Sequence, residues 1–351
     1  MGRAMSTASF SDRHFLSANI LLAPFCGLVT ALLVAGPASA QTKIVPASTN
    51  WTVGKDFEKN DKARTNLSGA ACVTKASPFT SCVIVNDEKK YAQFFSINET
   101  VIHPGNVIRL IAGDQEGDPD AEGAAYDDGY FYITGSHGRS RHHPENRNDS
   151  SYVILRFQVD TVTGAPAYRS RDPEVVGVEA SSRIRDVIKA EVPKFYDKPL
   201  DENGVNIEGI AVKDGRIYLG LRGPSDDGSA YVISVDAKAA FAPDQDLQAK
   251  ARKLQLGPDT GIRDLAAVAD GLLVLSGPVN DQPAVTPAVR HWDPKSGTLG
   301  PARELQVPDA AKQGKAETLL VLKDVAGEPW RVLVMFDGLE NGAPTEYAIP
   351  R

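Results

Sequence analysis

The stretch Asn206–Ala211, which reads NIEGIA, is one of five related stretches that decide the fold. Each copy has two leading residues, then an acidic or small polar residue, and then the start of a β-type run. The other four are Asn66–Ala71 (NLSGAA), Asp120–Ala125 (DAEGAA), Ile262–Ala267 (IRDLAA) and Lys315–Leu320 (KAETLL). Their third positions are 68, 122, 208, 264 and 317, so the copies recur at intervals of 54, 86, 56 and 53 residues. A period above about 50 residues is typical of a repeat architecture such as a β-propeller.

The sequence after each copy supports this interpretation. Turn dipeptides such as Asp128-Gly129, Asp214-Gly215 and Asp270-Gly271 are each followed by an apolar run of strand length. Several copies place Gly and Ala after the polar position, which suits strands that crowd around a common axis. We therefore predict an all-β fold, a single β-propeller domain over residues 41–351 with one four-stranded sheet per repeat.

The number of repeats predicts five blades, with six as the alternative. The fifth repeat has no outermost strand of its own, and we expect the N-terminal stretch Ile44–Val53 to close the ring by pairing with it. The longest interval contains residues 177–205, where Ile184, Val187 and Ile188 follow helical spacing. This segment is predicted to be an inserted helix and loop.

The charge balance excludes one class of partner. The chain has 38 Lys+Arg and 45 Asp+Glu, a formal net charge of −7. A protein that binds nucleic acid without regard to sequence needs a basic face to displace counterions, so we expect no nucleic-acid partner.

The first forty residues have the features of a targeting segment. Arg3 and Arg13 precede the apolar run Phe15–Ala35, and Ala38 and Ala40 give the small-residue pattern of a cleavage site. We predict a secretory signal peptide over residues 1–40, with an N-terminal membrane anchor as the alternative. This predicts a periplasmic or secreted protein, a monomer without a membrane span once the signal is removed.

Two cysteines remain after removal of that segment. Cys72 and Cys82 flank a turn-like stretch between two strand-like runs. An even pair of cysteines in an oxidising compartment predicts a disulfide that joins the two strands. A metal or redox pair is the alternative, but the spacing is not CxxC and no histidine is near.

The sequence resembles a family of secreted bacterial proteins known as domain of unknown function 3616. The residues that carry the resemblance are Glu122-Gly123 with Gly135–His137, Ile207–Gly209 with Gly220–Pro224, and Gly261–Leu265 with Ser276–Pro278. More distantly, the pattern is similar to esterase-like phytase and gluconolactonase-type propellers. The resemblance implies a propeller fold; the close family implies no activity, and the distant ones imply hydrolysis.

Four carboxylates occupy the same phase of successive repeats. Glu122, Glu208, Asp264 and Glu317 should therefore project toward one end of the central channel. Converging carboxylates can bind a divalent cation, for which Glu208, Asp264 and Glu317 are the candidate ligands and Ca²⁺ the expected ion. They can also act as general acid and base, for which Glu122, Glu208 and Asp264 are candidates. The alternative is that each carboxylate bonds backbone amides of the next blade.

Three arginines lie close to these positions in the sequence. Arg263 precedes Asp264 directly, and Arg139 and Arg222 follow second strands of their repeats. Guanidinium groups bind phosphate and carboxylate with forked hydrogen bonds, so Arg139, Arg222 and Arg263 are the candidate binding residues for an anionic substrate. The alternative is that they pair with the ring carboxylates as structural clasps.

His137 is the candidate catalytic histidine. It follows the strand-like run Tyr130–Ile133, whereas His142 and His143 stand in a polar stretch that we expect at the surface. The sequence has no GxSxG, HExxH, Walker or dinucleotide motif, so no nucleotide cofactor is expected.

These patterns lead to two functional hypotheses. The first is an exported hydrolase of a small anionic substrate, a phosphoester or a sugar-acid derivative, at the central funnel. The second is a non-catalytic propeller that binds a ligand or a component of the cell envelope through the same funnel.

Overall fold

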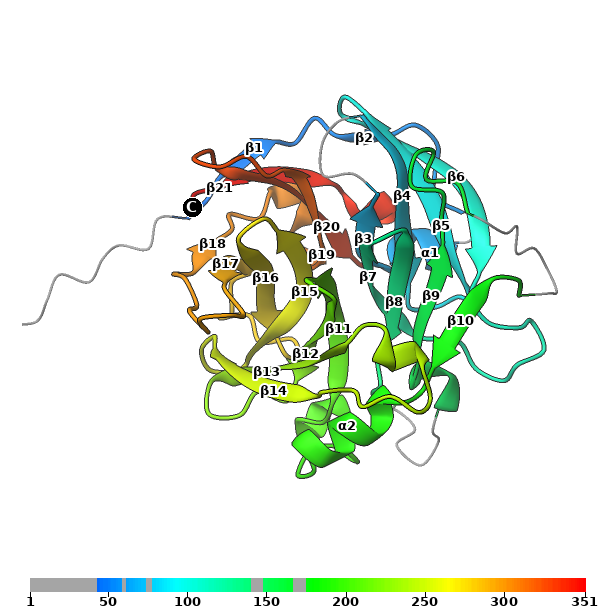
Figure 1. Cartoon of the computed structure of the whole chain (residues 1–351). Coiled ribbons are helices and arrows are strands. Elements are labelled where there is room, and N and C mark those ends of the chain that lie inside the picture. Colours follow the sequence, from blue (N-terminus) through cyan, green and yellow to red (C-terminus); the bar gives the residue numbers. More distant parts are fainter. Residues whose placement is uncertain (1–42, 59–60, 74–77, 140–147, 167–174) are drawn as a thin grey trace, which may run out of the picture. The chain divides into compact units, whose positions relative to one another are not determined.

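The strands of the computed structural model form five separate antiparallel sheets around a common axis (Figure 1). The structure describes residues 43–58, 61–73, 78–139, 148–166 and 175–351. The first sheet consists of β3 (Leu67–Cys72), β4 (Phe79–Asn86), β5 (Tyr91–Asn98) and β6 (Val101–Arg109), with the short β2 (Thr52–Val53) added in parallel to β6. The second consists of β7 (Ala121–Asp127), β8 (Tyr130–Gly135), β9 (Ile154–Gln158) and β10 (Val178–Ser181).

The remaining three sheets follow the same order from the axis outward. The third consists of β11 (Asn206–Lys213), β12 (Arg216–Gly223), β13 (Ser229–Asp236) and β14 (Lys250–Gln255). The fourth consists of β15 (Thr260–Val268), β16 (Gly271–Pro278), β17 (Ala288–Trp292) and β18 (Arg303–Glu304). The fifth consists of β19 (Lys315–Lys323), β20 (Trp330–Asp337), β21 (Thr345–Ile349) and β1 (Pro46–Ser48).

The innermost strands close a ring. β3 contacts β7, β7 contacts β11, and the contacts continue through β15 and β19 back to β3. The fold is therefore the predicted all-β propeller, and the blade number is five rather than six. The N-terminal stretch lies across two blades, because β1 pairs with β21 of the fifth sheet and β2 pairs with β6 of the first.

The apolar core lies between the sheets. Five clusters of buried apolar side chains each combine residues from two neighbouring blades. Ile207 and Tyr132, for example, belong to the cluster between the second and third blades. Each sheet is therefore buried on both faces, which explains why its strands read as nearly continuous apolar runs.

Glycine allows the innermost strands to approach one another. A Cβ added at Gly123 would lie 2.7 Å from the carbonyl oxygen of Glu208, and one added at Gly209 would lie 2.9 Å from the backbone of Asp264. At Gly69 it would lie 2.6 Å from the Cα of Gly123. These positions directly follow the polar residue of their repeats, so the polar residues of adjacent blades are brought close together.

Strand register brings a second set of residues to the same end of the axis. Each second strand ends beside the start of the first strand, as the pairs Asn206↔Gly223 and Lys315↔Asp337 show. In the first and second blades, Asn86 pairs with Leu67 and Gly135 pairs with Ala121. The ends of the second strands therefore reach the polar positions directly.

The few helices lie outside the ring of innermost strands. Between β10 and β11, α2 (Ile184–Glu191) buries Ile184, Val187 and Ile188 against the second and third blades. α1 (Asp61–Thr65) precedes β3. The 3₁₀ helices are η1 (Asp149–Ser151), η2 (Leu200–Glu202), η3 (Ala239–Phe241), η4 (Asp309–Ala311) and η5 (Glu340–Gly342).

The predicted disulfide is confirmed. Cys72 and Cys82 stand directly opposite each other in the β3–β4 pair and are joined through their sulfur atoms. The predicted signal segment, residues 1–40, lies outside the described residues. Within the part of the chain that the structure describes, no helix is long and apolar enough to cross a membrane.

The close approach at Gly123 leads to a prediction. We expect Gly123→Ala to lower the free energy of unfolding by about 2–3 kcal/mol, because the new methyl group would push the second and third blades apart. Urea denaturation measures this loss. The control is Gly215→Ala in the β11–β12 turn, where the added carbon meets nothing within 4 Å but the φ of 73° disfavours a side chain. It should cost about 1 kcal/mol, and equal losses at the two positions would contradict the steric explanation.

Candidate functional site at the mouth of the channel

The polar positions of the five repeats lie together at one end of the propeller axis. Ser68, Glu122, Glu208, Asp264 and Glu317 stand near the starts of the five innermost strands, and each is at most 8% exposed. We call this end of the axis the charged mouth. Burial of four carboxylates in one place is costly unless cations or hydrogen-bond donors compensate them.

Two arginines compensate part of this charge. Arg222, at the end of β12, places Nη1 2.7 Å from Oε1 of Glu208. Arg263, on β15, places Nε 2.9 Å from Oε2 of Glu208 and binds Glu317 through Nη2. The resulting chain, Arg222–Glu208–Arg263–Glu317, joins the third, fourth and fifth blades. Burial lowers the pKa of Arg263 to about 10, so the side chain still carries its charge at neutral pH.

Arg222 retains one donor group without a partner. Its Nε donates to the carbonyl oxygen of Val279 at 2.6 Å, and its Nη1 is bonded to Glu208. Its Nη2 is buried and finds no acceptor among the described residues. A buried guanidinium arm without an acceptor is costly, and an anionic ligand atom would satisfy it.

Asp264 has a structural role. Its carboxylate accepts hydrogen bonds from the backbone N–H groups of Leu265 and Leu319, each at 2.7 Å. Leu319 belongs to the next blade, so Asp264 joins β15 to β19. This is the interblade contact that the sequence left open as the alternative for the ring carboxylates. Burial raises the pKa of Asp264, and the two N–H donors act in the opposite direction.

Glu122 differs from the other ring carboxylates because neither a cation nor a backbone amide is bonded to it in the described part of the chain. The hydroxyl of Ser68 donates to its Oε2 at 3.3 Å. Burial, followed by the charges of Asp120 and Glu208, raises its pKa well above the ordinary value, and Arg222 acts in the opposite direction. Its carboxyl group therefore holds a proton more strongly than that of an ordinary glutamic acid.

Three aspartates complete the mouth, and the repeat pattern of the sequence does not point to them. Asp87 follows β4, Asp337 ends β20, and Asp120 precedes β7. Burial raises the pKa of Asp87 to about 8, with Asp120 and Asp337 as further causes. Burial raises the pKa of Asp120 to about 6, against a hydrogen bond donated by Ser136. The available signal was strand register, since Asp87 and Asp337 occupy the second-strand ends that Arg222 occupies in the third blade.

His137 and Arg139 lie apart from the network of arginines and carboxylates. Burial lowers the pKa of His137 to about 3, so its ring is neutral near pH 7. The ring packs edge-on against the ring of Tyr152, with 5.7 Å between the two ring centroids. No hydrogen bond or ion pair joins it to the carboxylates of the mouth in the described residues. Arg139 donates from Nη1 to the carbonyl oxygen of Asp197 at 2.9 Å. Arg141, His142 and His143 lie outside the described residues.

The three predicted calcium ligands bind other groups in the structure. Glu208 and Glu317 both bind Arg263, and Asp264 accepts hydrogen bonds from backbone amides. Across the described ranges, no group of three or more His, Cys, Asp or Glu residues is arranged to hold a metal ion.

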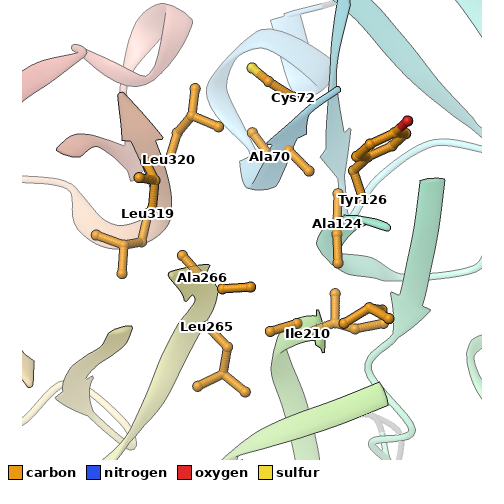
Figure 2. A pocket seen from close by; sticks show the side chains of 15 residues that line it. Ala70, Cys72, Ala124, Tyr126, Ile210, Leu265, Ala266, Leu319 and Leu320 are labelled. Carbon is orange, nitrogen blue, oxygen red and sulfur yellow. The ribbon is translucent and has the colours of Figure 1, made fainter. Parts of the chain in front are cut away.

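The opposite part of the axis is apolar. A cavity of about 50 Å³ lies among the later residues of all five innermost strands. Figure 2 shows Ala70, Ala124, Ile210, Ala266 and Leu319 around it. The axis therefore combines a charged mouth with a small apolar cavity. Among the residues that line these two parts, the acidic and basic side chains belong to the mouth.

Fold and mouth together define a five-bladed propeller with a buried network of carboxylates and arginines on its axis. The chain belongs to the family described as protein of unknown function DUF3616, whose model matches residues 83–163 and 180–346. A comparison with curated proteins finds no match.

Solved structures resemble the chain only remotely. An exo-β-1,3-galactanase from Phanerochaete chrysosporium bound to galactose shares 11% identity with a TM-score of 0.46, over 88% of this chain and 64% of the galactanase. The chain thus spans less than two thirds of that enzyme. Glutaminyl cyclase from Myxococcus xanthus shares 12% identity with a TM-score of 0.44, over 88% and 98% of the two chains. Regucalcin from Agrobacterium tumefaciens, a calcium-binding protein, shares 11% identity with a TM-score of 0.38, over 88% and 96%.

The raised pKa of Asp87 predicts how stability depends on pH. An unfolded aspartate has a pKa near 3.9, whereas folded Asp87 has a pKa of about 8. Between these values the folded state holds a proton that the unfolded state has lost, so the contribution of Asp87 to stability falls as pH rises from about 4 to about 8. We expect Asp87→Asn to raise Tm by several degrees at pH 8 and to change it little at pH 4. Thermal unfolding at both pH values measures this, with exposed Asp201→Asn as the control. An equal effect at both pH values would contradict the assignment.

Arg263 should be essential for stability, because it is 1% exposed and contacts two buried carboxylates. We expect Arg263→Met to cost about 3–5 kcal/mol of unfolding free energy, since Glu208 and Glu317 lose their shared cation. Adding Glu208→Gln and Glu317→Gln to this variant should recover most of the loss, as measured by urea denaturation. If the triple variant is as unstable as the single one, the loss comes from packing and not from uncompensated charge.

Proposed function

We propose that the protein is a hydrolase that acts on a small anionic substrate, a phosphoester or a sugar-acid derivative, at the charged mouth. The free Nη2 of Arg222 is the observation that carries the proposal, because it offers a buried donor to an anionic oxygen beside the protonated Glu122. The charges of Arg222 and Glu122 act on each other, so the two groups lie near each other at the mouth. We further propose that the protein works in the periplasm or outside the cell, where the Cys72–Cys82 disulfide is stable.

The catalytic roles follow from the different pKa values of two neighbouring carboxyl groups. Asp120, with a pKa of about 6, is ionised at neutral pH and can accept a proton from the attacking water. Glu122 keeps its proton and can donate it to the leaving oxygen as the ester bond breaks. One water is consumed, an alcohol and an acid are released, and exchange with solvent restores both carboxyl groups.

Arg263, Glu208 and Asp264 support this site rather than react in it. Glu208 orients Arg222 through the 2.7 Å contact, and Arg263 holds Glu208 in turn. Asp264 fixes the distance between the fourth and fifth blades through its two backbone hydrogen bonds. A cation is not part of this proposal, because the carboxylates that could have bound one are engaged by arginine and by the backbone.

A binding protein without catalytic activity is the second candidate. The observation that favours it is that Arg222 and Arg263 are both paired with carboxylates. These ion pairs stabilise the fold by themselves, so the charged groups have a role even if no reaction takes place. In this case Arg222 would hold an anionic ligand or an envelope component, and Glu122 would donate a hydrogen bond to it.

An activity screen separates the two candidates. We expect the purified protein to hydrolyse at least one member of a panel of phosphoesters, lactones and aryl esters. The rate should rise as pH passes about 6, because Asp120 must be ionised, and should fall at a higher pH when Glu122 loses its proton, because its pKa is raised. Glu122→Gln should lower kcat by about 10²–10⁴-fold, while Arg222→Lys should mainly raise KM.

The control is Glu340→Gln, an exposed carboxylate on η5. Its activity should equal that of the unaltered protein. Hydrolysis that persists in Glu122→Gln would refute the assigned proton donor. Anion binding without turnover on any substrate of the panel would favour the binding protein.

A further inference from the structure

The charged mouth has two electrically different sides. Arg222 and Arg263 come from the third and fourth blades, whereas Asp87, Asp120 and Asp337 come from the first, second and fifth. We call these three aspartates the acidic arc. Asp337 is brought beside the first blade by a hydrogen bond of 2.7 Å from the N–H of Gly338 to the carbonyl oxygen of Thr65. The carboxylates of the arc are close enough for the charges of Asp120 and Asp337 to act on Asp87.

No cation is bonded to the acidic arc in the described residues, although the charges of Arg263 and Lys315 act on Asp337 and that of Lys62 acts on Asp87. The nearby lysines bind other carboxylates: Lys62 binds Glu88 at 2.9 Å, and Lys315 binds Asp281 at 3.0 Å. No lysine, arginine or histidine forms an ion pair with Asp87, Asp120 or Asp337 among the residues that the structure describes. The further groups that face Asp87 are Glu88, which adds negative charge, and Asn66, which donates a hydrogen bond.

The opposite side contains an independent sign of a ligand. Arg222 is 6% exposed, and its Nη2 has no acceptor in the described part of the chain. Glu122 is influenced by both sides, because the charges of Asp87 and Asp120 as well as that of Arg222 act on its carboxyl group. A buried donor without an acceptor and carboxyl groups without an ion pair therefore lie at the same end of the axis.

We propose that the ligand of the charged mouth is zwitterionic, with its anionic group on Nη2 of Arg222 and an ammonium group on the acidic arc. This inference rests on the proposed function for the anionic half and adds the substrate class. A ligand with one charge would leave one side of the mouth uncompensated, whereas an amino-substituted phosphoester or sugar acid satisfies both.

Binding of the amine should be linked to proton release. Asp87 has a pKa of about 8, so it is mostly protonated at neutral pH in the free protein. An ammonium group favours the ionised carboxylate, and binding therefore expels the proton. The affinity for an amine should consequently increase as pH rises from about 6 to about 8 and then level off.

The test compares two matched probes by isothermal titration calorimetry. 2-Aminoethyl phosphate carries both groups, and 2-hydroxyethyl phosphate carries only the anion; longer aminoalkyl phosphates test the span between the two sides. We expect an amine in this series to bind at least about tenfold more tightly than its hydroxyl analogue at pH 8. Titrations at pH 7 in buffers with different ionisation enthalpies should show the released proton.

Variants locate the effect. Asp87→Asn and Asp337→Asn should each reduce the preference for the amine to less than about twofold, and Asp87→Asn should remove the proton release. Glu99 is an exposed carboxylate in the β5–β6 turn. The control Glu99→Gln should keep both the preference for the amine and the proton release. Thermal melts establish that each variant is folded. The number of protons released on binding is measured on the unaltered protein, so that measurement remains valid even if a variant does not fold.

Each outcome is decisive for one of the two proposals. Equal binding of the amine and hydroxyl probes refutes the zwitterionic ligand and leaves the anionic hydrolase standing. A clear preference for the amine without hydrolysis of any aminoalkyl ester supports the ligand class and refutes the hydrolase. Failure of every probe to bind refutes the zwitterionic ligand and the phosphoester as substrate, and the activity screen decides separately on sugar-acid derivatives.

Discussion

The close approach of the five innermost strands is the constraint on which the rest of the structure depends. Where a glycine faces the neighbouring backbone, as at Gly123 and Gly209, two strands lie too near for any side chain. The residue before each of these glycines is then forced into the small space around the axis. With carboxylates at most of these positions, the fold can exist only if donors and cations are brought to the same place, and Arg263, Arg222 and the amides of Leu265 and Leu319 meet this need.

Much of this arrangement could be predicted from repeats alone. The phase of the five copies correctly placed Glu122, Glu208, Asp264 and Glu317 around one axis, because residues in the same phase of a propeller repeat occupy equivalent positions. Asp87 and Asp337 could not be found in this way. They belong to second strands whose length varies, and only the pairing register brings their ends beside the first strands. The inserted segment was predicted only in part, since residues 177–205 contain the helix α2 and also the outermost strand of the second blade, Val178–Ser181.

The binding partner of each charged side chain could not be predicted from the sequence either. Asp264 and Glu208 occupy the same phase, yet one binds backbone amides and the other binds two guanidinium groups. The difference arises because Arg222 and Arg263 both extend toward Glu208, a matter of side-chain length and direction. Residues at equivalent positions of the repeats therefore have different partners, because the side chains around them differ from blade to blade. The same differences leave Nη2 of Arg222 without an acceptor and the acidic arc without an ion pair.

The position of β1 has a consequence for how the molecule is made. Pro46–Ser48 is the outermost strand of the sheet that contains Thr345–Ile349, so the two ends of the described chain meet in one blade. This contact spans nearly the whole sequence, and contacts of such long range form late. The early blades can pair internally during folding, but the ring of innermost strands stays open until β19 packs against β3. Until then the first and fifth blades each expose an apolar face that the folded protein buries.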